Sequence, residues 1–265
     1  MSRISTLAAA GATALLALSS LTACGPDNSS ADAAATPAAT AGGTAKPTPG
    51  TTTGATGGAT TAGATAGTAD ASGVPASAWI AAADIPLAAA YHWQPPAGAA
   101  ATAKNPKFQF EQLCRSTRAP ENDLGDWKGP AAQASLVAGN RADWQVKQTI
   151  IHFPGTSSMG AQMASSLYRG LEEELKACGT SVRGATAKVT GTSNPTDGNS
   201  DLAATVTVPV QGGTSTLHVY LSLTGRVVTE LALWSDRPAH PWAAPADADV
   251  LKALAAPICP AVKDC

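Results

Sequence analysis

A long tract without aromatic residues confines any folded core to the part of the chain that follows it. Between Gly25 and Pro75, Val74 is the one branched aliphatic residue, and Ala, Thr, Gly and Pro dominate. Such a composition cannot bury enough apolar surface to offset the chain entropy lost on folding. We therefore expect residues 24–75 to form a disordered tether. Residues 76–265, about 190 in number, suffice for one domain with a sizeable core.

The N-terminus has the pattern of a secretory signal peptide, predicted here over residues 1–23. Arg3 supplies a positive charge, and the apolar run Leu7–Leu18 is too short for a membrane span. The sequence Leu21-Thr22-Ala23-Cys24 resembles the bacterial lipobox, which implies cleavage before Cys24 and a diacylglyceryl group on its sulfur. We expect an exported protein, lipid-anchored at the outer face of the bacterial cytoplasmic membrane. The alternative is an ordinary secretory signal with an incidental cysteine.

Four cysteines remain for the folded domain: Cys114, Cys178, Cys259 and Cys265. An even number in an exported chain favours disulfides, although four cysteines allow three pairings. Pro260 favours a small terminal loop between Cys259 and Cys265, which leaves Cys114 to pair with Cys178. The chain has no CxxC motif and no two histidines at helical spacing, so we expect no metal and no cofactor.

Hydrophobic patterns predict an α+β domain with an antiparallel sheet, one long helix and two short helices. The long helix is expected from Ser158 to Cys178, with Met163, Leu167, Leu171 and Leu175 on one face, and the short helices at 82–90 and 246–256. Short strands are expected at Phe108 and Phe110 and at 131–138, and a further strand at 144–153. A four-strand meander follows, at 185–190, 202–210, 214–223 and 226–234.

The last two strands of this meander suggest a candidate site. A three-residue loop, Leu223-Thr224-Gly225, would gather the leucines and valines of both strands on one face, whereas a two-residue loop would not. The three-residue register places His218 opposite Glu230 on the solvent face, with Tyr220 and Trp234 nearby. Such a pair is either an acid/base couple for a hydrolase or an ordinary cross-strand ion pair.

Charge and motifs exclude several function classes. The folded part holds 15 Lys+Arg and 16 Asp+Glu, so nucleic acid is not expected as a partner. No nucleophile-elbow, HExxH, Walker or GxGxxG motif occurs outside the tether, and we therefore expect no enzyme activity. Four tryptophans fall in predicted loops or segment ends, where they suit ligand or protein contact unless they seal the core. They are Trp79, Trp93, Trp127 and Trp242.

The order of these features resembles the PknH-like extracellular sensor domain of actinobacteria. Asp84-Ile85-Pro86 precedes Trp93, Cys114 follows, and a strand ends in His152-Phe153-Pro154 before the long helix that closes at Cys178. The resemblance spans roughly residues 79–259. It implies an α+β domain with two disulfides and a ligand-binding cleft between helices and a curved antiparallel sheet, found on receptor kinases and as free lipoproteins. Cys114 and Cys178 match the spacing of the family's main bridge.

Taken together, the sequence predicts a cell-surface lipoprotein with a non-enzymatic, sensor-like domain that binds a small or lipidic ligand. The residues expected to contact the ligand are Trp93, Trp127, His218, Tyr220 and Trp234. The alternative is an interaction protein that regulates another component of the cell envelope through its loop tryptophans. A hydrolase that uses His218 and Glu230 is the third hypothesis.

Overall fold

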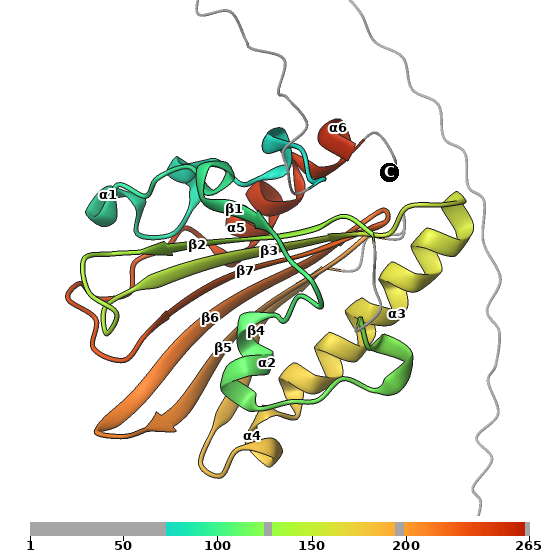
Figure 1. Cartoon of the computed structure of the whole chain (residues 1–265). Coiled ribbons are helices and arrows are strands. Elements are labelled where there is room, and N and C mark those ends of the chain that lie inside the picture. Colours follow the sequence, from blue (N-terminus) through green and yellow to red (C-terminus); the bar gives the residue numbers. More distant parts are fainter. Residues whose placement is uncertain (1–72, 125–128, 194–198, 263–265) are drawn as a thin grey trace, which may run out of the picture. The chain divides into compact units, whose positions relative to one another are not determined.

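Seven antiparallel strands form one sheet, in the order β1-β2-β3-β7-β6-β5-β4, and helices cover both of its faces (Figure 1). The computed structural model describes residues 73–124, 129–193 and 199–262. The strands are β1 (Ala100–Thr102), β2 (Ala131–Val137), β3 (Gln145–His152), β4 (Thr186–Ser193), β5 (Ser200–Val210), β6 (Gly213–Thr224) and β7 (Val227–Ser235). The predicted α+β class and the four-strand meander β4–β7 are therefore confirmed.

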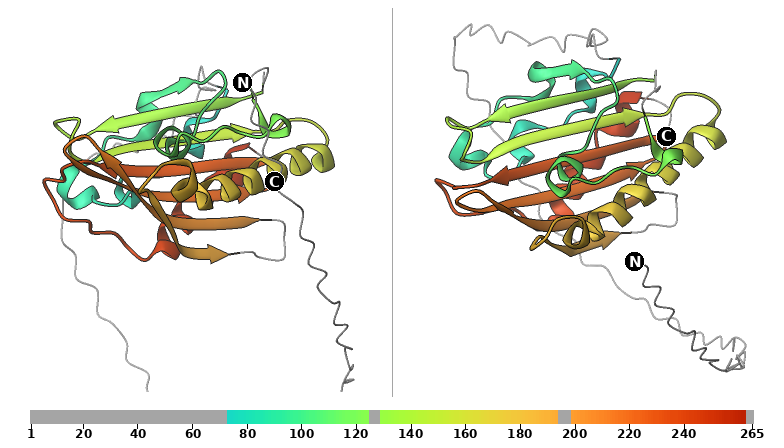
Figure 2. Two further views of the ribbon diagram at one scale, coloured as in Figure 1. Left: turned by 90° about the horizontal axis from the view of Figure 1, so that it is seen from below. Right: turned by 60° about the horizontal axis from the view of Figure 1, so that its bottom comes forward.

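One face of the sheet, called here the α3 face, packs against α2 (Gln109–Cys114), α3 (Ser157–Lys176) and α4 (Cys178–Ser181). Figure 2 shows α3 running along this face. Leu167, Leu171 and Leu175 of α3 are buried as predicted, but Met163 is 41% exposed and does not join them. Gly160 allows a close approach, because a Cβ there would lie 2.6 Å from the carbonyl oxygen of Phe153.

The opposite face, the α5 face, is covered by both ends of the described chain. The N-terminal segment contributes η1 (Ala76–Ala78), η2 (Ala82–Asp84), α1 (Ala88–Tyr91) and η3 (Pro96–Ala99), and the C-terminal segment contributes α5 (Asp247–Ala255) and α6 (Ile258–Val262). A short turn, η4 (Pro120–Asn122), lies beside α3. Among the described helices, none is both long and apolar enough to span a membrane.

Two predicted elements differ from the structure. The helix expected at 82–90 is divided into η2 and α1, because Leu87 at the break adopts a left-handed conformation with φ of 66°. Ile85 and Leu87 are thereby both buried in the α5 face. Phe108 and Phe110, expected in a strand, are instead the residue before α2 and its second residue. Two aromatic residues at alternating positions did not distinguish a strand from the start of a helix.

The predicted register of the last two strands is wrong. The turn holds two residues, Gly225 and Arg226, and pairs Thr224 with Val227, so that His218 lies opposite Leu233 and Glu230 opposite Leu221. His218 and Tyr220 face α5, whereas Glu230 and Trp234 lie on the α3 face. The prediction assumed that one face of the sheet meets water. Helices cover both faces here, and polar residues therefore do not mark a solvent side.

A disulfide joins Cys114 at the end of α2 to Cys178 at the start of α4, as predicted. Both cysteines are fully buried in the core of the α3 face. Cys259 lies in α6, but Cys265 lies outside the described residues, so the second predicted bridge stays a prediction.

Candidate functional site

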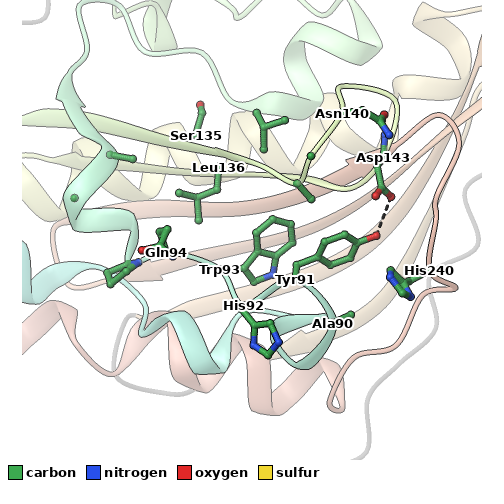
Figure 3. A pocket seen from close by; sticks show the side chains of 16 residues that line it. Ala90, Tyr91, His92, Trp93, Gln94, Ser135, Leu136, Asn140, Asp143 and His240 are labelled. Atoms are coloured by element: carbon green, nitrogen blue, oxygen red, sulfur yellow. Dashed lines mark hydrogen bonds between the residues drawn. The ribbon is translucent and has the colours of Figure 1, made fainter.

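A cavity of about 860 Å³ lies between the N-terminal segment and the turn that joins β2 to β3 (Figure 3). The N-terminal segment supplies Ala90 to Pro95, Gly98 and Ala99. The end of β2 and the following turn supply residues 135–140 and Asp143, and His240 closes the rim. The walls thus come from three parts of the chain that are far apart in sequence.

The N-terminal wall is fixed by Trp93. Its indole N–H donates a hydrogen bond to the carbonyl oxygen of Pro86 at 2.9 Å, and the side chain packs into the core of the α5 face, leaving 7% exposed. His92 precedes it in a left-handed conformation with φ of 47°, which ends α1. Trp93 therefore lines the cavity as part of a rigid wall rather than as a free loop side chain.

Tyr91 joins the two walls of the cavity. Its ring stacks on Trp93 with centroids 4.9 Å apart, and its hydroxyl donates to Asp143 Oδ1 at 2.8 Å (Figure 3). Burial and this hydrogen bond raise the pKa of Tyr91 to about 12, so the hydroxyl stays protonated at neutral pH. The ring of His240 meets that of Tyr91 edge-on at 5.3 Å.

Asp143 is the charged group at the centre of this arrangement. Burial acts to raise its pKa, but hydrogen bonds from the backbone N–H of Ala239 and the hydroxyl of Tyr91 outweigh burial and leave the pKa below its ordinary value. Asn140 Oδ1 accepts hydrogen bonds from the N–H groups of Ala142 and Asp143, at 2.8 and 3.0 Å. The turn is thus held in one conformation, and the carboxylate of Asp143 is used to hold the walls together.

A second aromatic group continues from the cavity along the α5 face. The indole N–H of Trp144 donates to the carbonyl oxygen of His240 at 2.9 Å, and Trp144 lies 5.0 Å from Trp242. Trp242 in turn stacks on His218, with ring centroids 3.5 Å apart and planes nearly parallel. Burial lowers the pKa of His218 to about 4, so the imidazole is neutral at pH 7 and acts as a stacked ring.

The structure brings only some of the predicted ligand contacts to the cavity. Trp93 lines it, and His218 belongs to the adjoining aromatic group. Tyr220 is buried under α5, where its hydroxyl donates to Asp247 Oδ1 at 3.1 Å. Trp234 lies on the α3 face, on the other side of the sheet. Trp127 lies outside the described residues, as does the predicted lipidation site Cys24.

Glu230, the other half of the predicted His218 pair, has a structural role on the α3 face. Its carboxylate accepts the N–H of Gln109 at 2.8 Å and, more weakly, that of Phe110 at 3.4 Å, and so caps the start of α2. Lys147 lies on the same face and donates to the carbonyl oxygen of Lys107 at 2.9 Å. The couple that acid/base catalysis would need is therefore not formed.

No three His, Cys, Asp or Glu side chains within the described part of the chain lie close enough together to hold a metal ion. Sequence reasoning found Trp93 but missed Tyr91, Asn140, Asp143 and His240. The Gly139-Asn140 pair before a strand was the available signal for a fixed turn. The contact of Tyr91 with Asp143 joins residues 52 positions apart, and nothing in the local pattern predicts it.

The comparisons with known proteins do not assign this chain to a family. No protein-family model matches the chain, and no curated protein matches it. The resemblance to the PknH-like sensor domain therefore stays a prediction.

Proposed function

We propose that this chain is an exported, lipid-anchored protein whose folded domain binds a small molecule in the cavity between Tyr91, Trp93 and the β2–β3 turn. The single observation that carries the proposal is the cavity of about 860 Å³ with a preformed aromatic wall. Ligand sites in proteins typically span about 300–1,000 Å³ and combine apolar walls with a few convergent polar groups.

The lining supports a ligand that is partly apolar. Trp93 and Leu136 contribute buried apolar surface, while Gln94, Asn140 and His240 contribute hydrogen-bonding groups. The hydrogen bonds among Tyr91, Asp143 and Ala239 hold the walls together without a ligand. A preformed site of this kind avoids much of the entropy cost of ordering loops on binding.

The two other hypotheses have less support. The hydrolase hypothesis needs His218 beside Glu230, but the two side chains lie on opposite faces of the sheet. The interaction hypothesis relied on exposed loop tryptophans, whereas Trp79 and Trp93 are only 5% and 7% exposed. Both contribute to the core, which favours binding in a cavity over binding through a flat aromatic patch.

A pair of glycine substitutions tests the proposal. Gly98 lines the cavity, Gly213 lies at the distant β5–β6 turn, and a Cβ added at either would meet no atom within 4 Å. Neither glycine has a positive φ. Gly98→Leu should therefore occupy the cavity without strain, and Gly213→Leu is its matched control.

The readout is native mass spectrometry of each full-length protein purified from its own cell envelope. We expect wild type and Gly213→Leu to carry a bound molecule. The fraction of Gly98→Leu protein that carries this molecule should be lower by about tenfold or more. Equal retention in all three proteins would show that the molecule binds elsewhere. Absence of any bound molecule from wild type would contradict the proposal.

A further inference from the structure

A second cavity, of about 540 Å³, lies between α5 and the ends of β4, β5 and β6 that are near residues 191, 201 and 224. One wall is a stripe along α5 that continues to α6, consisting of Ala248, Leu251, Lys252, Ala255, Ala256 and Cys259. These residues recur three or four positions apart, so they share one side of the helix. The alanine and leucine side chains make this wall mostly apolar, and Lys252 is its one charged residue.

The opposite wall contains a carboxylate without a positively charged partner. Asp201 lies on the α5 face in β5, where it pairs with Ser222 of β6. Its Oδ1 atom is shielded from solvent and accepts no hydrogen bond. Burial raises the pKa of Asp201, and the Ser222 hydroxyl offsets this only in part. Among the described Lys and Arg residues, none forms an ion pair with it, and Lys252, which also lines the cavity, is exposed.

Two electrostatic features therefore act in the same direction in this cavity. A partly buried carboxylate that lacks a counter-charge is costly to ionise and is stabilised by any cation that reaches it. Ala255, in the last turn of α5, also lines the cavity, and the C-terminal end of a helix carries partial negative charge. The site favours a positive group at one end and an apolar body along the helix.

We propose that this second cavity binds an amphiphile with a primary ammonium group, whose charge pairs with Asp201 while its hydrocarbon part lies against the α5 stripe. An ionised carboxylate accepts hydrogen bonds and donates none, and an ammonium group offers three donors together with a charge. A fatty acid would place like charges together, and an alcohol would bring a donor without a charge. The inference uses residues that do not line the first cavity and does not depend on its function.

The test compares the binding of octylammonium, 1-octanol and octanoate to the full chain by isothermal titration calorimetry. At about pH 8 octylammonium carries a positive charge and octanoate a negative charge. We expect octylammonium to bind about tenfold more tightly than octanol, and octanoate to bind most weakly. Equal affinities for the three would indicate apolar adsorption and overturn the proposal. So would the absence of octylammonium binding.

Substitutions identify the groups responsible. Asp201→Asn should weaken octylammonium binding about tenfold, to the level of octanol, and leave octanol binding unchanged. Asp236→Asn, which removes an exposed carboxylate outside the cavity, should bind all three as wild type does. An unchanged affinity in Asp201→Asn would refute the pairing.

Two further variants on the α5 wall test whether binding occurs inside the cavity. Ala248→Leu, at an exposed position on the α5 wall, should weaken octylammonium and octanol alike by filling the space. Lys252→Met should not weaken octylammonium, because Lys252 carries a like charge. A loss of affinity in Lys252→Met, or unchanged affinities in Ala248→Leu, would mean that binding occurs outside the cavity.

Discussion

The carboxyl group of Glu230, a residue of β7, is completely buried between β3 and the start of α2. Burial is the largest influence and raises its pKa to about 7 from an ordinary value of 4.5, against the opposing effects of the Gln109 N–H and the Lys147 ammonium group. Glu111, the other acid nearby, adds to the rise. Lys147 itself has a pKa lowered by burial. The proton on Glu230 is therefore coupled to folding.

We predict that Glu230→Gln changes the pH dependence of stability. Between about pH 5 and 7 the folded wild type retains a proton that the unfolded chain has released, so its free energy of unfolding decreases as the pH rises. Over this window wild type should lose about 2 kcal/mol relative to Glu230→Gln, which has no such proton. Urea denaturation at a series of pH values measures the difference. Glu173→Gln removes an exposed carboxylate and is the control, which should show the pH dependence of wild type. The same pH dependence of the free energy of unfolding in wild type and Glu230→Gln would contradict the prediction.

At the scale of elements, α2 depends on contacts from distant parts of the chain. It has only six residues, too few for a stable isolated helix. Glu230 caps its start, and Cys114 joins its end to Cys178, a residue 64 positions later. An ion pair between Glu111 and Arg118 also fixes the loop that leaves it. The disulfide thus connects this segment to the end of the long helix.

We predict that the double variant Cys114→Ala/Cys178→Ala has a free energy of unfolding about 4 kcal/mol below that of wild type, from the loss of a constraint on the unfolded chain. Urea denaturation of the oxidised proteins measures it, and peptide mapping without reduction serves as the control on pairing. Mapping should also yield the Cys259–Cys265 peptide that the sequence predicts. Recovery of Cys178 joined to Cys259 would contradict both pairings.

Elements with long patterns were predictable from sequence, whereas those set by tertiary contacts were not. The alternating residues of β6 and the leucine repeat of α3 each extend over enough residues for their periodicity to predict a strand and a helix. The break at Leu87 and the short α2 depend on contacts with the sheet, and no local pattern predicts them. In the candidate site, Trp93 could be predicted because tryptophan is common at binding sites. Tyr91 could not be predicted, because its hydrogen bond to Asp143 depends on the fold, which brings the two residues together.

At the scale of the whole molecule, the sequence predicts that Cys24 carries the lipid anchor. Cys24→Ala should abolish lipidation, and the protein should remain unprocessed or be released from the membrane. Ser20→Ala, which leaves the four lipobox residues intact, is the control. Fractionation followed by intact-mass measurement tests this. Cys24→Ala protein found in membranes at the processed mass of wild type would show that the anchor lies elsewhere.

The strand order has a consequence for when the proposed binding site can exist. β3 pairs with β7 rather than with β4, and the first cavity takes walls from residues 90–99, 135–143 and 240. Because a long stretch of chain separates β3 from β7, their pairing is slow relative to the formation of a local hairpin. In a chain synthesised from its N-terminus we expect the β2–β3 hairpin to form early, but β3 lacks its other neighbour until β7 has been made. The proposed ligand binding is therefore expected only near the end of biogenesis, and a nascent or truncated chain that lacks residues 227–240 should not bind.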